Sequence, residues 1–420
     1  MKHIKKIVSA ILVLGLVFSL AACSSGSSGG NGTKKTLTVS VDSANSAYAE
    51  FVNSIKGKFE KENNVKVKIV KKPMLDQLTA LTLDGPAGKA PDVMLAPYDR
   101  VGGLGQQGQL LEVDKGMLSF LSDKGQRQVE FDKKYYGVPL TIEALVLYYN
   151  KDLVKTAPKT FKDLEALAKD KRFAFKSEAG KNTGFLAKWT DFYFAYGLYA
   201  GYGGYVFGNN DTNPKDIGLN NEGSVEAVTY ATHWFQKVWP KGMQDVKAAG
   251  NFVTNQFVKG KAGAVIDGPW QAAVYKKSKI NYGVAKIPTL PNGQEYKPFA
   301  GGKAWVASSY TKNPSLAKKW LAYATNATNA YKFYTDANEI PINLDAQAKV
   351  NSSKDELAKA VIKQYDSSVP MPNIPEVAEV WTTMEPAMFN AASGKKTPKQ
   401  TLDDAVSSLH KTIKQKYKDK

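Results

Sequence analysis

One segment of the chain is dense in aromatic side chains. From Trp189 to Phe207 it reads WTDFYFAYGLYAGYGGYVF, and nine of these 19 residues are aromatic. Phenylalanine rings suit a buried helix, but a buried tyrosine hydroxyl or tryptophan N–H needs a polar partner. The rings with such a polar group are Trp189, Tyr193, Tyr196, Tyr199, Tyr202 and Tyr205. Sugars present apolar C–H faces and a rim of hydroxyls, so we predict that part of this segment contacts carbohydrate and that most of its rings are structural.

Metal, cofactor and nucleophile chemistry find little support in the sequence. The chain has one cysteine and three histidines, which excludes an internal disulfide and a cysteine-based zinc cage. Only His233 lies away from the chain ends, and a lone histidine in a helical pattern is usually a packed or surface residue. A Ser-His-Asp triad and a histidine-rich metal site are therefore disfavoured, and we expect no cofactor.

A glycine motif at residues 103–108 matches the dinucleotide pattern GxGxxG. That pattern needs a tight strand-to-helix turn, so that the helix N-terminus meets a pyrophosphate. Here the motif lies eight residues past the nearest expected strand, behind Asp99 and Arg100. We predict a glycine-rich surface turn instead of a cofactor site.

The N-terminus has the composition of an export signal. Lys2, Lys5 and Lys6 precede a 14-residue apolar run that ends at Leu20, which is shorter than the ~20 residues that a membrane-spanning helix needs. Leu20-Ala21-Ala22-Cys23 resembles the bacterial lipobox, in which the cysteine is lipidated. We therefore predict a lipoprotein signal peptide over 1–22, lipidation at Cys23 and a flexible tether over 23–35.

The formal net charge is +18, and removal of residues 1–22 takes away three lysines and no acidic residue. The lysines are spread along the chain without an arginine-rich block or a nucleic-acid motif, so we expect no nucleic-acid partner. An anionic cell wall or lipid surface fits an exported basic protein better. The basic charge and the lipobox together predict the extracellular face of the membrane of a single-membrane, Gram-positive bacterium.

Hydrophobic periodicity indicates alternating strands and helices. We expect strands at 37–41, 65–69, 92–95, 145–149 and 262–266, and a helix with Tyr48, Phe51, Val52, Ile55 and Phe59 on its buried face. Thr160 is expected to cap a helix that runs through Leu167, and Thr397 to cap a C-terminal helix. The alternation predicts an α/β fold with parallel sheets, and 420 residues suggest two domains.

Several separate blocks resemble bacterial maltose/maltodextrin-binding proteins in order and spacing. They are Pro91-Asp92-Val93 with 98–103, Val138-Pro139 through Glu143 to 149–153, Asp267-Gly268-Pro269-Trp270, 281–284 with Pro288, Lys297-Pro298-Phe299, and Met371-Pro372-Asn373-Ile374-Pro375 with Trp381 and 390–394. The blocks run from about residue 36 to the end. The resemblance implies a two-lobed, type II periplasmic-binding-protein-like fold and a solute-binding protein of an ABC importer.

The same resemblance implies the sugar contacts. Asp99 and Arg100 would bond sugar hydroxyls from the first lobe, and Glu143 from the hinge. In the second lobe Asp191 matches a glutamate position, Tyr193 a stacking tyrosine, and Trp270 and Trp381 two stacking tryptophans. Met371 lies beside Trp381, and Asp42 and Asp76 match more loosely as first-lobe acceptors.

Some positions depart from the family pattern. Ala96 replaces a frequent tryptophan, Met74 replaces a lysine contact, and Thr382 and Glu385 replace an aromatic residue and an arginine. The preferred length of the bound glucan is therefore expected to differ from that of other family members. Tyr98 and Tyr196 are candidates to supply the missing ring.

We predict lobe 1 at 36–142 plus about 301–350, lobe 2 at 144–300 plus about 356–420, and hinge crossings near Glu143, Gly301-Gly302 and 350–356. The expected protein is a monomer that captures maltodextrin, releases it unaltered to a membrane permease, and is not an enzyme. Three alternatives stay open: a lipid-anchored glycosidase, since 39 acids offer many carboxylate pairs, an adhesin for wall polymers, and a binding protein for another oligosaccharide.

Overall fold

The computed structural model describes residues 34–417, and residues 35–420 form one compact unit. The predicted leader and Cys23 lie outside the described residues, as does all of the predicted tether except its last two residues. Within the described range, no helix combines the length and apolar character needed to cross a membrane.

Two mixed sheets organise the described chain. The first has the order β2-β1-β3-β13-β6, the second the order β11-β7-β10-β8, and two further pairs are β12-β14 and β4-β5. The strands are β1 (Lys35–Asp42), β2 (Val65–Lys72), β3 (Val93–Pro97), β4 (Glu130–Phe131), β5 (Lys134–Tyr135), β6 (Val138–Pro139), β7 (Val146–Asn150), β8 (Phe185–Ala187), β9 (Asn213–Ile217), β10 (Ala264–Asp267), β11 (Tyr282–Ala285), β12 (Phe299–Ala300), β13 (Lys303–Ala307) and β14 (Val369–Pro370).

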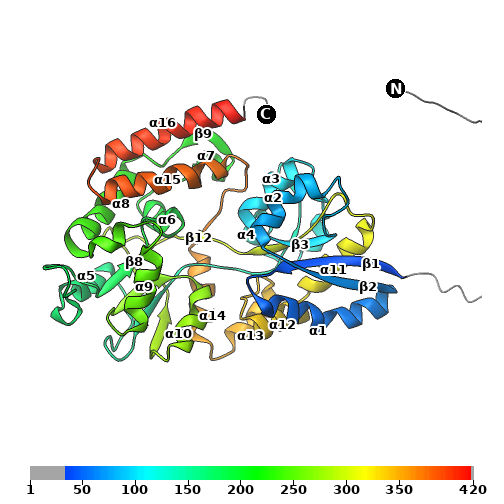
Figure 1. Cartoon of the computed structure of the whole chain (residues 1–420), viewed down its shortest axis with the longest axis horizontal. Coiled ribbons are helices and arrows are strands. Elements are labelled where there is room, and N and C mark those ends of the chain that lie inside the picture. The colour runs from blue at the N-terminus through cyan, green and yellow to red at the C-terminus, as the bar shows by residue number, and fades with distance from the viewer. Residues whose placement is uncertain (1–33, 418–420) are drawn as a thin grey trace, which may run out of the picture. The chain divides into compact units, whose positions relative to one another are not determined.

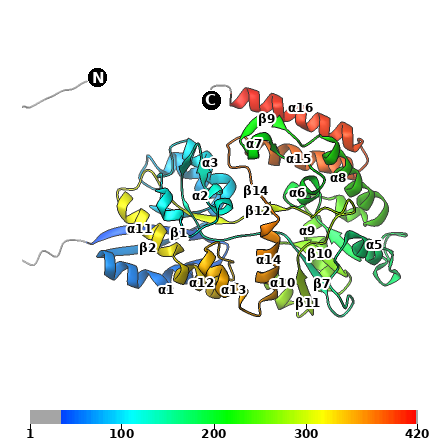
Figure 2. The same cartoon turned by 180° about the vertical axis from the view of Figure 1, so that it is seen from behind.

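Helices cover both sheets. They are α1 (Ser46–Asn63), α2 (Met74–Asp84), α3 (Tyr98–Gln106), α4 (Asp123–Arg127), α5 (Phe161–Lys169), α6 (Phe192–Gly201), α7 (Gly208–Asp211), α8 (Glu222–His233), α9 (Ala249–Val258), α10 (Ala272–Lys277), α11 (Pro314–Thr325), α12 (Ala327–Ala337), α13 (Leu344–Asn351), α14 (Glu356–Asp366), α15 (Val377–Ala392) and α16 (Pro398–Lys416). In Figures 1 and 2, α1, α2, α3, α11 and α12 surround the first sheet, and α5 to α10, α15 and α16 lie with the second.

The expected helix signals are present. The five predicted apolar residues of α1 are all buried. Thr160 and Asp163 form a capping box at α5. A second capping box, Thr397 with Gln400, begins α16, whose buried stripe includes Leu402 and Leu409. Local sequence therefore determines these helix starts, because each cap satisfies backbone N–H groups that lack a helical partner.

The sheets are α/β as predicted, but they are not purely parallel. β1 is parallel to β2 and β3, whereas β13 is antiparallel to β3 and β6. In the second sheet β10 is parallel to β8 and antiparallel to β7. The reason is the route of the chain: β13 enters the first sheet after crossing from the second, at the edge where β3 ends, so it must run in the opposite direction.

The chain passes between the sheets in several places. It passes from β6 to β7 through residues 140–145 and from β12 to β13 through Gly301 and Gly302. A third passage joins α13, which packs on α12, to α14, which packs on β7 and β11. The β12-β14 pair lies between the two sheets in both ribbon views (Figures 1 and 2).

The prediction of a surface turn at residues 103–108 is wrong. Most of this segment belongs to α3, which runs to Gln106. Gly102, which precedes this segment in the same helix, permits close packing, since a β-carbon on it would lie 1.9 Å from the carbonyl oxygen of Asn373. The Gly102 N–H also donates to Asn373 Oδ1 at 2.5 Å. Gly102 thus allows α3 to lie against the segment that follows β14.

We predict that Gly102→Ala lowers the free energy of unfolding by about 1–3 kcal/mol, because the added carbon forces the backbone at Asn373 to move. Gly57→Ala is the matched control. It lies within α1 with open space around it, so it should stabilise the protein by about 0.5–1 kcal/mol. Urea unfolding of both variants measures this, and an unchanged midpoint for Gly102→Ala would contradict the packing argument.

Candidate functional site

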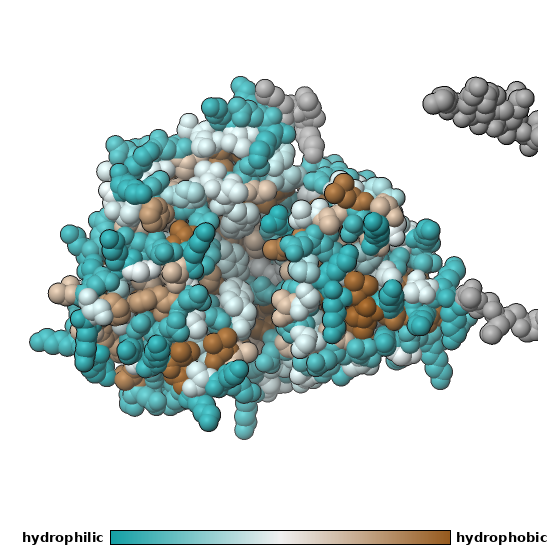
Figure 3. Space-filling view, in the orientation of Figure 1, coloured by the Kyte–Doolittle hydropathy of each residue, from teal (hydrophilic) through white to brown (hydrophobic). Residues whose placement is uncertain are grey.

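The sequence-predicted residues gather where strands end. β1 and β3 are parallel, so Asp42 at the end of β1 and Asp99 just after β3 lie at the same edge of the first sheet. β8 and β10 are also parallel, and Asp191 and Trp270 follow their carboxyl ends. Crevices at the carboxyl ends of strands are the usual ligand sites of open α/β sheets. The surface is hollowed between the two groups of elements (Figure 3).

Four rings form a continuous aromatic cluster. The ring centroid of Tyr193 is 6.2 Å from that of Trp270 and 6.0 Å from that of Phe299. Phe299 lies 5.6 Å from Trp381 in turn. Trp270 is 46% exposed, and Tyr193 and Trp381 are half-buried. Three predicted stacking residues from α6, the turn after β10, and α15 thus come together around buried Phe299, a residue that the site prediction missed.

Several other rings of residues 189–207 serve the core, as expected. Trp189 is fully buried and its N–H donates to the hydroxyl of Tyr296 at 3.2 Å. The Tyr199 hydroxyl donates to the sulfur of Met388. Tyr196 stacks on Phe299 with centroids 3.7 Å apart. The polar groups of Trp189 and Tyr199 are therefore satisfied internally, and the Tyr196 ring is covered by Phe299, so these three rings are not free to cover a ligand.

Trp270 is presented by a turn built on a buried carboxylate. Asp267 accepts hydrogen bonds from the Gly268 N–H at 2.8 Å and from the Tyr275 hydroxyl at 3.0 Å. Burial raises the pKa of Asp267 to about 6. A β-carbon on Gly268 would lie 2.2 Å from the Trp270 ring. The ring therefore packs directly over Gly268, which fixes its direction.

Glu143 lies where two chain passages meet. Its N–H donates to the Gly301 carbonyl, and the Gly301 N–H donates to the Glu143 carbonyl, each at 2.9 Å. A β-carbon on Gly301 would lie 3.1 Å from the Tyr193 hydroxyl. Burial raises the pKa of Tyr193, and Glu143 adds to that effect. The aromatic cluster thus begins beside the carboxylate expected at the hinge.

A buried charge network holds the Glu143 side chain. Lys303 pairs with Glu143 and, at 3.3 Å, with Glu339, whose carboxylate also accepts from the Tyr48 hydroxyl. Burial alone would lower the pKa of Lys303, but Glu143 and Glu339 raise it above its ordinary value. Burial raises the pKa of Glu339, against the opposing effect of Lys303. Sequence reasoning missed Lys303, Glu339 and Tyr48, because only the fold brings these distant residues together.

Asp99 and Arg100 are adjacent and differ in exposure. Their side chains are 10% and 44% exposed, and Arg100 Nε lies 3.4 Å from Asp99 Oδ2. Burial raises the pKa of Asp99, while Arg100 opposes the shift. Arg100 also lines a cavity of about 210 Å³ between α2 and α3. Its guanidinium therefore has donors available beyond its carboxylate neighbour.

The remaining predicted residues are less free. Asp42 Oδ1 accepts from the Ala44 N–H at 3.1 Å and the Met74 N–H at 3.4 Å. Asp191 caps α6 and pairs with Lys188 at 2.9 Å. These carboxylates already stabilise local structure. Asp76 is exposed in the first turn of α2, and Met371 is half-buried after β14.

The two candidates to replace the missing ring, Tyr98 and Tyr196, have other roles, and that of Tyr196 is its stacking on Phe299. Tyr98 is buried, and its hydroxyl donates to the Thr141 carbonyl at 2.5 Å. It cannot replace the ring missing at Ala96, because its face is inside the core. His233, at the end of α8, is exposed, which agrees with the expectation of a packed or surface residue. Within residues 34–417 no group of His, Cys, Asp and Glu side chains could hold a metal ion.

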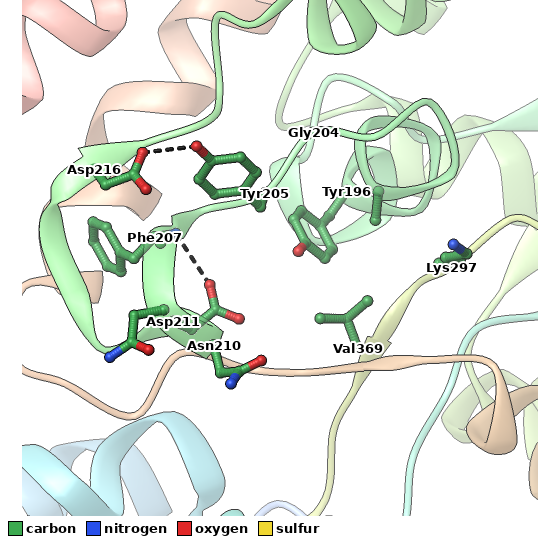
Figure 4. A pocket seen from close by; sticks show the side chains of 12 residues that line it. Tyr196, Gly204, Tyr205, Phe207, Asn210, Asp211, Asp216, Lys297 and Val369 are labelled. Carbon is green, nitrogen blue, oxygen red and sulfur yellow. Dashed lines mark hydrogen bonds between the residues drawn. The ribbon is translucent and has the colours of Figure 1, made fainter.

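A separate cavity of about 400 Å³ lies beside α7. Tyr205 donates to Asp216 at 2.7 Å, and the Phe207 N–H donates to Asp211 at 3.0 Å (Figure 4). Burial raises the pKa of Asp211 to about 6. The cavity shares Tyr196 with the aromatic cluster's surroundings but contains none of the predicted site residues.

We predict that Lys303→Met lowers the free energy of unfolding at pH 7.5 by about 3–5 kcal/mol, because two buried carboxylates lose their counter-charge. The pKa of Glu339, already raised, should rise further. A carboxyl with a raised folded pKa stabilises the fold while protonated, so the deficit should grow as pH rises through that pKa and shrink toward pH ~4.5. Denaturant unfolding across this pH range is the measurement.

Lys332→Met is the control for this variant. Lys332 pairs with Asp336 at 3.0 Å on the surface of α12, and such pairs contribute about 0–1 kcal/mol. Equal losses of unfolding free energy in the two variants would show that the Lys303 network stabilises the fold no more than a surface ion pair does.

Comparisons with known proteins identify the family. Residues 55–360 match the family model described as bacterial extracellular solute-binding protein. The chain is 61% identical over 403 residues to the maltodextrin-binding protein MdxE of Bacillus subtilis, with 96% of each chain covered. It is 46% identical to a maltooligosaccharide ABC transporter solute-binding lipoprotein of Streptococcus pneumoniae, covering 98% of this chain and 99% of the relative.

A solved structure supports the same assignment. The crystal structure of the maltose-binding periplasmic protein MalE from Listeria monocytogenes, in complex with maltose, superposes with a TM-score of 0.87 and 63% identity, over 91% of this chain and 99% of the other. The two-lobed type II fold expected from the sequence resemblance is thereby confirmed, and the chain belongs to the family of bacterial extracellular solute-binding proteins.

Proposed function

We propose that this protein captures maltose and maltodextrins between its two lobes and delivers them to the permease of an ABC transporter. The observation that carries the proposal is the aromatic cluster of Tyr193, Trp270, Phe299 and Trp381, which begins beside Glu143 at the chain crossings. Flat rings cover the apolar faces of glucose units, and charged groups bond the hydroxyls. The names of the maltodextrin-binding relatives support the same substrate class.

Each candidate residue has a role in this proposal. Trp270, Tyr193 and Trp381 stack against sugar rings, with Met371 beside them. Glu143 and Asp99 accept from hydroxyls, and Arg100 donates to them. Hydrogen bonds with one ionised partner are about twice as strong as neutral ones. Asp42, Asp76 and Asp191 are weaker contributors, since Asp42 and Asp191 have local partners and Asp76 is exposed.

The lobes are proposed as residues 36–142 with about 301–350, and 144–300 with about 356–420. The first sheet falls in the first set and the second sheet in the other. Hinge closure around a ligand is the general motion of periplasmic binding proteins. A sugar that touches both lobes only when they close shifts the equilibrium by its differential affinity for the closed state.

The proposal includes attachment to a membrane. A signal peptide at 1–22 and lipidation at Cys23 would hold a monomer on the outer face of the membrane of a Gram-positive bacterium. Tethering raises the effective concentration of the protein at the transmembrane subunits of its permease. The relative from Streptococcus pneumoniae is a solute-binding lipoprotein, which supports this location.

Binding without chemistry is the first testable consequence. Incubation with maltotetraose should leave the sugar intact, whereas a glycosidase would release shorter sugars in proportion to protein and time. Chromatography of the products decides between them. Calorimetric titration with maltose, maltotriose, maltotetraose, a cyclodextrin and a galacto-oligosaccharide should give heat with glucans only. Preferential binding of the galacto-oligosaccharide would overturn the substrate class.

We predict that Trp270→Ala weakens maltodextrin binding roughly 10- to 100-fold, about 1.4–2.8 kcal/mol, because an exposed stacking ring is lost. The melting temperature should change little, since the ring is 46% exposed.

Trp320→Ala provides the opposite case. Trp320 is fully buried, so the variant should lose about 3–5 kcal/mol of stability and keep its affinity where it remains folded. Tryptophan fluorescence titration and thermal melts measure both quantities. If Trp270→Ala mainly unfolds the protein, that ring belongs to the core.

A further inference from the structure

A basic groove lies at the free edge of the first sheet, away from the proposed sugar site. β2 is the outermost strand, and between this edge and α1 is a cavity of about 580 Å³. Four lysines line it, Lys56 from α1 and Lys66, Lys68 and Lys71 from β2, together with Thr36 and Asn53. None of the proposed sugar-binding residues takes part.

The four groove lysines are not neutralised. No acidic residue lines the cavity, and within residues 34–417 none of the four forms an ion pair. By contrast, two neighbouring lysines are paired, Lys58 with Glu62 and Lys72 with Asp84. Lysines on an edge strand do discourage pairing with another chain, but that role does not require Lys56, which α1 contributes to the same groove.

The groove lies close to the point where the described chain begins. β1 starts at Lys35, which is opposite Val65 in the parallel pair, and Thr36 is opposite Lys66. Adjacent strands lie about 4.8 Å apart and rise about 3.3 Å per residue. Lys66 is therefore next to the entry of the chain, and Lys71 lies roughly 17 Å further along the strand.

Chain length places a membrane within reach of this groove if Cys23 carries lipid. Twelve residues, from Ser24 to Lys35, follow Cys23 up to the start of β1, and a Gly/Ser-rich stretch of that length spans roughly 17–21 Å on average. From the end of that stretch, the four lysines extend at most roughly 17 Å further along β2. A bilayer surface is the nearest source of many negative charges.

We propose that this lysine groove binds the anionic phosphate headgroups of the membrane, phosphatidylglycerol being the chemical model. The groove is a second attachment point beside the lipid, and it turns the β2 edge of the first sheet toward the bilayer. The sugar site remains accessible, because it lies at the carboxyl ends of the strands, roughly 23 Å along β1 from Lys35. The inference rests on lipidation of Cys23 but not on the identity of the sugar.

The test uses residues 23–420 with Cys23→Ser, so that no lipid contributes. All described helices and strands lie within the compact unit 35–420, so this chain keeps every one of them. Sedimentation with vesicles of phosphatidylcholine alone, or with about 30% phosphatidylglycerol, measures binding at 0.1 M and 0.5 M salt. Binding should require phosphatidylglycerol and weaken at high salt, because salt screens exposed charges.

Two variants that each lose four positive charges distinguish binding at the groove from attraction by the net charge of the protein. The first replaces Lys56, Lys66, Lys68 and Lys71 with glutamine. The control replaces Lys259, Lys261, Lys276 and Lys277, which are exposed near α9 and α10. Each lysine near an anionic surface contributes roughly fivefold in affinity, so the groove variant should lose at least tenfold and the control less than threefold. Both should bind maltodextrin normally, which verifies their folding.

Each other outcome overturns the proposal. Equal losses in the two variants would show attraction by net charge only. If the unsubstituted chain shows no binding that depends on phosphatidylglycerol, the protein has no such membrane-binding surface. Groove-dependent binding to polyglycerol phosphate at concentrations where vesicles do not bind would assign the groove to wall polymer instead of lipid.

Discussion

The exchange of two main-chain hydrogen bonds between Glu143 and Gly301 is the constraint on which the site depends. It joins two passages of the chain between the sheets at one point. Gly301 has no side chain, so the Tyr193 hydroxyl can approach the same point. Lys303, two residues later, pairs with the Glu143 carboxylate and brings Glu339 and Tyr48 into one network. The carboxylate is therefore held by both backbone and charge.

Burial divides the aromatic residues into two groups with different roles. Trp189, Tyr196 and Tyr199 are packed inside, and their environments satisfy or cover their polar groups. Trp270 stays exposed because Gly268 and buried Asp267 shape the turn beneath it. Phe299 connects the exposed and buried rings, so the face offered to a ligand rests on a rigid core. Such preorganisation reduces the entropy lost on binding.

The distribution of charge suggests two separate tasks. Sugars are neutral, and in the proposed site carboxylates lie next to cations, as with Asp99 and Arg100 or Glu143 and Lys303. The excess of positive charge, +18 over the whole chain, has no use in binding a neutral ligand. The four lysines of the groove beside β2 have no acidic residue among the lining, which fits contact with an anionic surface better than contact with substrate.

The sequence by itself determined the α/β class, the buried face of α1, the capped starts of α5 and α16, and the family, because these depend on local periodicity, caps and motifs. It also led to the prediction that Trp270, Tyr193 and Trp381 stack against sugar, three residues that the structure brings into one cluster. Only the tertiary structure decided that β13 runs antiparallel, that residues 103–106 belong to a helix which packs against Asn373 through Gly102, and that Tyr98 is core. It alone joined Tyr48, Glu143, Lys303 and Glu339. Their separations in sequence are long, and a charge network depends on distances in space, which residue spacing does not reveal.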